Sequence, residues 1–258
     1  MDLCAKIVGA VKAQLAMPNL KVAFQPVTSA NRIPLLQNGT IDIECGSTTN
    51  SVERQKQVAF GPTYFVINVS AAVKKSSGIK SFADLAGKTV ASTSGTTSIP
   101  LLRGYEKAKG IDFKELQGKD HAESMQLLAT DRAQAFIMDD ILLAGQIANQ
   151  QNPGDFVILP ESLRTEPYGV MLRRDDPQFK ALVDKTLVPE ADPAAQRQPE
   201  LPDDACDQGS VREPQRQGRA VAPVGRNLKN AGTTRVFRRP RHELQVELGR
   251  LLPADARR

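Results

Sequence analysis

The sequence predicts an α/β fold with a parallel sheet covered by helices, arranged as two lobes with the second inserted into the first. Two observations predict it. Helical and strand-like apolar patterns alternate along residues 1–188 and are joined by short connections. An order of helix, strand, helix, strand favours parallel strands with helices packed on the faces of the sheet. After Val188 this pattern stops, and residues 189–258 form a tail of different composition.

The first lobe opens with a helix and continues with a strand, a helix and a strand. KVAFQPV (21–27) and TIDIECG (40–46) are the expected strands, and Ser29 is the expected cap of a helix that runs through Gln37. The opening helix, over residues 2–16, is indicated by five apolar residues at helical spacing: Leu3, Ile7, Val8, Val11 and Leu15.

The second lobe repeats this alternation. FVINVSAAV (65–73) reads as a strand, and residues 88–108 read as a strand, a Gly-Thr-Thr loop and a helix that Ser98 can cap. FKELQG (113–118) precedes a helix start at 120–124. The remaining predicted elements are a buried strand and helix over 132–148, a strand over 168–177, and the helix QFKALVDKTLV.

The tail differs from the rest of the chain in charge and in proline content. Residues 189–258 hold 1 Lys and 12 Arg against 10 acidic residues, and 8 of the 17 prolines. Such a segment is too polar to build a core, so we expect it to be disordered. Acidic residues are interleaved with the arginines and Phe237 is the tail's one aromatic residue. Nucleic acid is therefore not an expected partner.

The sequence indicates no metal and no cofactor. Its three cysteines lack metal-ligand spacing, its two histidines are far apart, and it has no Gly-x-Ser-x-Gly, phosphate-loop or GxGxxG motif. No segment approaches the ~20 apolar residues of a membrane helix. The first residues, Met-Asp-Leu-Cys, do not form a secretory signal, so the chain as written is expected to be cytoplasmic.

Candidate binding residues follow the strands of both lobes, where ligands of open α/β sheets bind. The stretch GTIDIECGSTTNSVERQKQVAF (39–60) ends a strand in a hydroxyl-rich turn and then brings an arginine. Ordinary caps, turns and exposed ion pairs would explain each residue separately. Taken together, the candidates are Ser29, Arg32, Ser47, Thr49, Arg54, Thr96, Thr97, His121 and Asp139.

The charges of these candidates match an acidic amino acid. Such a ligand has two carboxylates and one ammonium group, and Arg32, Arg54 and Asp139 supply two cations and one anion. The planar guanidinium group of arginine suits bidentate binding of carboxylates.

Several motifs closely resemble a known family over residues 2–187. They are VTSANRIPLLQNGTIDIECGSTTNSVERQKQVAF, SGTTS, KDHAES, RAQAFIMDDILLAG and YGVMLRRDDPQFK. They resemble the periplasmic glutamate/aspartate-binding proteins of ABC amino-acid importers, within family 3 of the solute-binding proteins. The resemblance implies a two-lobed, type II clamp that binds L-glutamate or L-aspartate between its lobes, delivers it to an ABC permease, and acts as a monomer without catalysis.

The resemblance also implies lobe boundaries and residue roles. Lobe one would comprise residues 1–66 and 167–188, and lobe two residues 67–166. Arg54 and Thr49, with Thr96 or Thr97, would hold the α-carboxylate. The ammonium group would be bound by Ser47 and Asp139, and the side-chain carboxylate by Ser29, Arg32 and His121.

The chain also departs from the family pattern. The secretory signal, the first central strand of lobe one and an arginine-bearing loop have no counterpart, and the tail replaces the family's C-terminal helix. Our hypothesis is a truncated, frameshifted copy in which two lobe-one strands have open edges. Such a copy is either a receptor that binds less well than its parent or a non-functional remnant. Cys4 and Cys45 could pair in an exported parent and would stay reduced in the cytoplasm. The alternative function is an enzyme on this fold, of dehydratase or hydrolase type, with His121 as acid/base.

Overall fold

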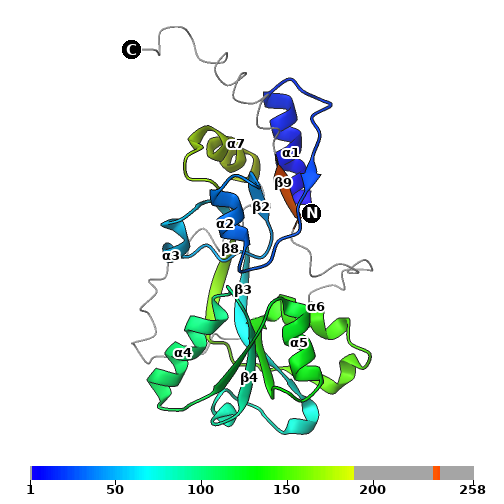
Figure 1. Cartoon of the computed structure of the whole chain (residues 1–258), viewed down its shortest axis with the longest axis vertical. Coiled ribbons are helices and arrows are strands. Elements are labelled where there is room, and N and C mark those ends of the chain that lie inside the picture. The colour runs from blue at the N-terminus through cyan, green and yellow to red at the C-terminus, as the bar shows by residue number, and fades with distance from the viewer. Residues whose placement is uncertain (1, 189–234, 239–258) are drawn as a thin grey trace. The chain divides into compact units, whose positions relative to one another are not determined.

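The computed structural model describes residues 2–188 and 235–238, which Figure 1 shows in colour. These residues fall into two compact units. Unit 1 comprises residues 2–66, 166–188 and 235–238, and unit 2 comprises residues 67–165. The chain passes from unit 1 to unit 2 within strand β3 (Ala59–Lys74) and returns within strand β8 (Arg164–Leu172).

Unit 1 contains a sheet in which every described pair of strands is antiparallel. Its strands lie in the order β1, β9, β2, β8. Besides β8, the elements of this unit are α1 (Asp2–Gln14), β1 (Ala23–Phe24), α2 (Arg32–Gln37), β2 (Ile43–Cys45), α3 (Val52–Gln55), α7 (Pro177–Leu187) and β9 (Arg235–Arg238).

Three predictions for the sheet of unit 1 are wrong. Its strands do not pair in parallel, since every described pair is antiparallel. The strand expected over residues 21–27 is only two residues long. Its ladder ends before Pro26, which has no N–H to donate. The edges of β1 and β2 that were expected to be open are paired instead, because β9 of the tail lies between the two strands. The rest of the tail, residues 189–234 and 239–258, lies outside the described residues.

Helices α1 and α7 pack on each other and cover the β2 and β8 side of unit 1. A disulfide joins Cys4 of α1 to Cys45 of β2, with their Cα atoms 6.1 Å apart. A second cluster of buried side chains lies under α2. The core that α1 and α7 form with β2 and β8 comprises Ile7, Val11, Leu20, Ile43, Val170, Leu172, Phe179, Val183 and Leu187.

Unit 2 has the parallel sheet that the sequence predicts. β4 (Thr89–Thr93) pairs in parallel with β5 (Lys114–Gly118) and β6 (Ala135–Asp139), and β3 joins β6 in antiparallel orientation. In Figure 1, α5 (His121–Ala129) and α6 (Asp140–Ala148) lie side by side, away from α4 (Ser98–Lys109). The short strand β7 (Phe156–Ile158) pairs with β3.

The parallel strands of unit 2 place three helix starts at one edge of the sheet. Helices α4, α5 and α6 follow β4, β5 and β6 in turn, so their first residues lie beyond the carboxyl ends of these strands. Buried apolar side chains, including Met125, Leu128 and Phe136, fix the helices on the sheet. The fold thereby gathers the polar residues at these helix starts.

Candidate functional site

In unit 1, two buried arginines bind the same turn from two different helices. Arg32 opens α2, is 3% exposed, and donates from Nη1 to the carbonyl of Ser47 at 3.2 Å. Arg54 lies in α3, is 9% exposed, and donates from Nη1 to the carbonyl of Thr49 at 3.1 Å. The turn after β2 thus places two guanidinium groups close together.

The hydroxyl of Thr49 is part of a buried hydrogen bond. Thr49 Oγ1 donates to Glu166 Oε2 of β8 at 2.7 Å, and both residues are buried. Residue 49 also forms a bridge to Tyr168 of the same strand. Thr49 therefore links the turn to β8, and its oxygen can still accept a hydrogen bond.

Ser29 does not cap α2, contrary to the sequence prediction. The helix begins at Arg32 after Asn31, and the half-buried Ser29 lies in a turn between Thr28 and Asn31. Thr28 N donates to Asn31 Oδ1 at 2.7 Å, and Asn31 N donates to Thr28 Oγ1 at 3.3 Å. This pair fixes the turn without the hydroxyl group of Ser29.

Glu44 of β2 is a fully buried carboxyl group behind the turn. Its Oε2 accepts from Thr48 Oγ1 at 2.8 Å, and its Oε1 lies 3.8 Å from Nη1 of Arg32. Burial raises the pKa of Glu44, and the nearby Arg32, Thr48 and Arg54 oppose that rise only in part. Burial and the charge of Glu44 also raise the pKa of Tyr64, whose hydroxyl donates to the carbonyl of Gly46.

In unit 2, the loop after β4 turns at Gly95, whose φ of +80° favours glycine. Thr96 is buried, and its hydroxyl donates to the carbonyl of Thr93 at 2.7 Å. Thr97 is half-buried at the N-cap position of α4, and its side chain makes no capping bond. Ser98 is the first helical residue, so its expected capping role is wrong.

His121 opens α5 and is held by a chain of hydroxyl groups. Its Nδ1 lies 3.0 Å from Thr93 Oγ1, which lies 2.8 Å from Ser124 Oγ. Ser124 donates to the carbonyls of Ser92 and Asp120. The helix starts where the sequence predicts, and Asp120 caps it by accepting from Glu123 N at 2.9 Å. These contacts fix the imidazole ring from its Nδ1 side.

Asp139 ends β6 and is 2% exposed. It occupies the N-cap position of α6, but its side chain forms no capping bond. The next residue, Asp140, accepts from Ile141 N at 2.8 Å and from Asn68 Nδ2 at 3.3 Å. Of this pair, Asp140 is therefore the carboxylate that bonds the start of the helix.

The structure thus gathers the candidates into two sets. Ser29, Arg32, Ser47, Thr49 and Arg54 belong to unit 1, around the start of α2 and the segment from the turn after β2 to α3. Thr96, Thr97, His121 and Asp139 belong to unit 2, at the starts of α4, α5 and α6. Glu44, Glu166 and Thr93 were not predicted from the sequence, although acidic residues within apolar strands were a usable signal.

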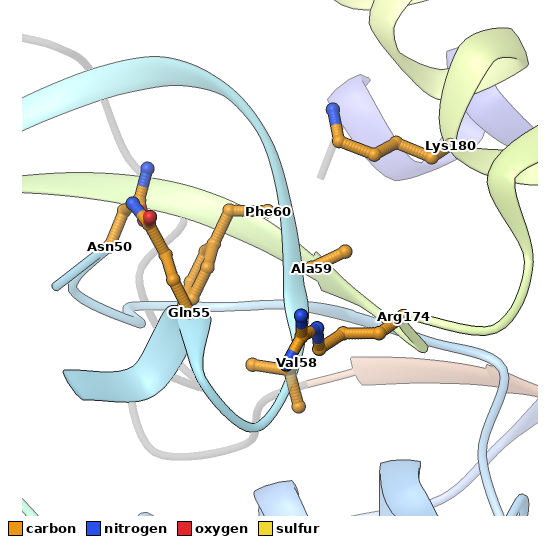
Figure 2. Close-up of a pocket in the computed structure, with 7 residues that line it drawn as sticks. All are labelled: Asn50, Gln55, Val58, Ala59, Phe60, Arg174 and Lys180. Carbon is orange, nitrogen blue, oxygen red and sulfur yellow. The ribbon is translucent and has the colours of Figure 1, made fainter. Parts of the chain in front are cut away.

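A pocket of about 370 Å³ in unit 1 contains none of the predicted site residues. Figure 2 shows its lining, to which Asn50 and Gln55 contribute amides and Arg174 and Lys180 contribute cations. Both cations are already bonded, Arg174 to the carbonyl of Lys56 and Lys180 to Asp184. We therefore do not assign the ligand to this pocket.

Residues 3–189 match the family described as bacterial extracellular solute-binding proteins, family 3.

This chain belongs to that family.

The "Glutamate/aspartate import solute-binding protein" of Escherichia coli (strain K12) is 50% identical over 186 residues, which are 72% of this chain and 62% of that protein. The "L-glutamate/L-aspartate-binding protein" of Pseudomonas aeruginosa is 48% identical over the same shares of each chain. The chain thus spans about 62% of the length of these relatives.

Solved structures agree with the fold. An ancestral arginine-binding protein bound to glutamine is 29% identical, with a TM-score of 0.62 over 72% of this chain and 80% of that one. A periplasmic binding protein from Brucella ovis, with glutathione bound, has a TM-score of 0.65 at 24% identity over 72% of this chain and 58% of that one. The periplasmic-binding-protein fold expected from the sequence is confirmed.

Among the described residues, no helix has the length and apolar character needed to cross a membrane. Within the same residues, no group of His, Cys, Asp and Glu side chains is arranged to hold a metal ion.

Proposed function

We propose that this chain is the solute-binding component of an ABC importer for acidic amino acids, with L-glutamate or L-aspartate as its ligand. Its two units act as the lobes, with residues 1–66 and 167–188 in lobe one and residues 67–166 in lobe two. The relatives named for glutamate and aspartate, at 48–50% identity, support this substrate class. The other partner is an ABC permease, and the binding protein itself works as a periplasmic monomer.

One observation carries the proposal: two buried guanidinium groups bind the same turn in unit 1. A buried arginine stays charged, so a pair of them favours an anionic ligand. Arg54 would hold the α-carboxylate together with the backbone N–H of Thr49, since the hydroxyl proton of Thr49 is donated to Glu166. Arg32, with Ser29, would bind the side-chain carboxylate, and Ser47 would bind the ammonium group.

Unit 2 supplies the complementary groups. Asp139 is a buried carboxylate, which suits the ammonium group of an amino acid. At the start of α4, Thr97 would donate to the α-carboxylate, or Thr96 once its hydroxyl leaves the carbonyl of Thr93, and backbone N–H groups there also favour an anion. His121, held on its Nδ1 side by Thr93, would present its other nitrogen to the side-chain carboxylate.

The enzyme alternative finds no support in the comparisons, since the two relatives described above are named as an import solute-binding protein and an amino-acid-binding protein. In that alternative His121 would be the acid/base group. The described contacts of its Nδ1 with Thr93 fit a fixed binding residue equally well.

Isothermal titration calorimetry on the purified chain tests the proposal. Glutamate and aspartate should give a saturable heat, whereas leucine and arginine should give none. Equal responses to neutral and basic amino acids would overturn the assignment. A folded chain, shown by circular dichroism, that binds no acidic amino acid would instead identify the non-functional remnant expected from the sequence.

A further inference from the structure

Arg32 and Glu44 form an incompletely matched buried pair in unit 1. Their closest oxygen and nitrogen atoms are 3.8 Å apart, which is an ion pair but too long for a hydrogen bond. Among the described residues, neither Oε1 of Glu44 nor Nε of Arg32 has a hydrogen-bond partner. Because Glu44 is 0% and Arg32 3% exposed, solvent water cannot supply the missing hydrogen bonds. The pair is therefore poorly compensated as two full charges.

Only one member of the pair can lose its charge. Arginine remains protonated in proteins, whereas a carboxyl group in an apolar setting readily takes up a proton. Burial raises the pKa of Glu44, which fits the oxygen that accepts no hydrogen bond. Within the described part of the chain, the hydroxyl of Thr48 is the one side-chain donor to this carboxyl group.

The other charged or titratable groups around Glu44 each have a described partner. Arg54 of α3 remains a cation, and Tyr64 of β3 is a neutral phenol that donates to Gly46. Asp42, on the same face of the β2 segment, pairs with Arg173 at 3.3 Å. On β8, Glu166 accepts from Thr49, and the neighbour of Glu44 across the ladder is Met171. Side chains of β9 are outside the description.

We propose that Glu44 is the exchangeable counter-charge of Arg32: it balances the guanidinium when the site is empty and takes up a solvent proton when an acidic ligand binds. The inference rests on the proposed function, in which Arg32 binds the side-chain carboxylate. That carboxylate replaces the negative charge of Glu44, and the proton adds to the Glu44 carboxyl group with no other bond made or broken. Glu44 is thus a positioning residue that contributes to the choice of acidic over neutral ligands.

The chemistry of the ligand decides whether the exchange occurs. Glutamate brings a carboxylate into a buried region, where two neighbouring carboxylates and one guanidinium group would leave an uncompensated negative charge. Protonation of Glu44 removes it. Glutamine brings a neutral amide, which adds no negative charge and therefore does not favour protonation of Glu44. Proton uptake should therefore accompany glutamate and be absent with glutamine.

Calorimetry in buffers of different ionisation enthalpy measures this uptake. The wild-type chain should take up a fraction of a proton with glutamate, and its Kd should rise by up to about tenfold per pH unit once Glu44 ionises in the empty site. Glu44→Gln should lose that uptake and flatten the pH profile. Glu53→Gln, an exposed carboxylate on α3, is the matched control and should retain both. Uptake that is unchanged in Glu44→Gln would overturn the proposal.

A second variant and a second readout separate this inference from the proposed function. Thr48→Val removes the donor to Glu44 and should move the onset of the pH effect upward by a measurable fraction of a unit. In the ligand-free chain, the raised pKa of Glu44 makes its contribution to the free energy of unfolding depend on pH. The contribution is complete below about pH 4.5 and is lost as the pH rises through the pKa of Glu44 in the folded chain. Urea unfolding should show that loss in wild type and not in Glu44→Gln.

The two readouts distinguish failure of the exchange from failure of the proposed function. If the chain does not bind acidic amino acids but keeps its pH-dependent unfolding, the proposed function is refuted and the unusual protonation of Glu44 is retained. Binding of glutamate without proton uptake refutes the exchange and retains the proposed function.

Discussion

Thr49 donates its hydroxyl to Glu166, a residue 117 positions further along the chain, at 2.7 Å. The first segment of unit 1 is thereby bonded to the returning strand β8 at the turn that both arginines bind. Thr49, which is proposed to contact the ligand, is thus also a structural contact. Substitution by valine, which keeps the size, and by serine, which keeps the hydroxyl group, can test the hydrogen bond apart from the volume of the side chain.

Thr49→Val should destabilise the fold and weaken glutamate binding, whereas Thr49→Ser should do little of either. Valine keeps the volume but leaves the buried Glu166 without this donor, at a cost of about 1–3 kcal/mol in the free energy of unfolding. Urea unfolding of the two variants checks the prediction. Equal stability of Thr49→Val and wild type would show that the hydrogen bond is dispensable.

Arg54→Ala should be the most damaging single change for binding. It would leave the α-carboxylate without its guanidinium partner, and the loss of one member of a buried charge pair typically costs about 2–5 kcal/mol. Calorimetry against Lys56→Ala provides the comparison, because Lys56 is an exposed neighbour paired with Glu53. A loss in Arg54→Ala no larger than in Lys56→Ala would exclude the assigned role.

Arg32→Ala should change ligand preference rather than abolish binding. Without the second guanidinium group, glutamate loses its side-chain partner and glutamine loses little, so the ratio of their Kd values should shift towards the neutral ligand. Parallel titrations with both amino acids measure that ratio. If the two affinities fall by the same factor, Arg32 does not bind the side-chain carboxylate.

Reduction of the Cys4–Cys45 disulfide should lower the stability of unit 1. The bond closes a loop with a sequence separation of 41, and crosslinks of this kind typically contribute about 2–4 kcal/mol. Thermal unfolding with and without dithiothreitol, and of Cys4→Ser, checks the effect. Cys206→Ser is the control for loss of a thiol, and an identical melting temperature for Cys4→Ser would contradict the prediction.

Val236→Pro should weaken the sheet of unit 1 and leave unit 2 intact. Residue 236 is opposite Glu44 in the β2–β9 ladder, and proline removes a backbone donor from a strand bonded on both sides. Hydrogen exchange should show faster exchange at β1 and β2 only. If residues 2–60 exchange slowly in both chains, β9 is not needed to complete this sheet.

The sequence indicated the elements whose signals are local. Helix α5 starts within 120–124 as expected, and the Gly-Thr loop opens α4, because capping and left-handed turns depend on few neighbours. The position of β9 depends on pairing with strands about 200 residues away, which no local pattern encodes. The strand expected over 21–27 is short because Pro26 has no N–H to donate to a ladder.

Candidate residues could be predicted from the sequence where a polar side chain ends or follows a strand, as Asp139 and Thr49 do. Glu44 and Glu166 were missed because burial of a charge depends on the partners that tertiary structure supplies. The roles of the nine candidate residues towards ligand remain predictions.

The adjacent carboxylates at the start of α6 also bear on how such a receptor could change its ligand. Asp140 accepts from the N–H of Ile141, and the side chain of Asp139 forms no capping bond, so the helix does not rely on Asp139 for its cap. If Asp139 binds the ammonium group as proposed, substitutions at position 139 can alter which head group is accepted without loss of the cap of α6. Substitution of Thr49 lacks that freedom, because its hydroxyl group bonds the turn to Glu166 of β8. New specificities should accordingly arise more readily through position 139 than through position 49.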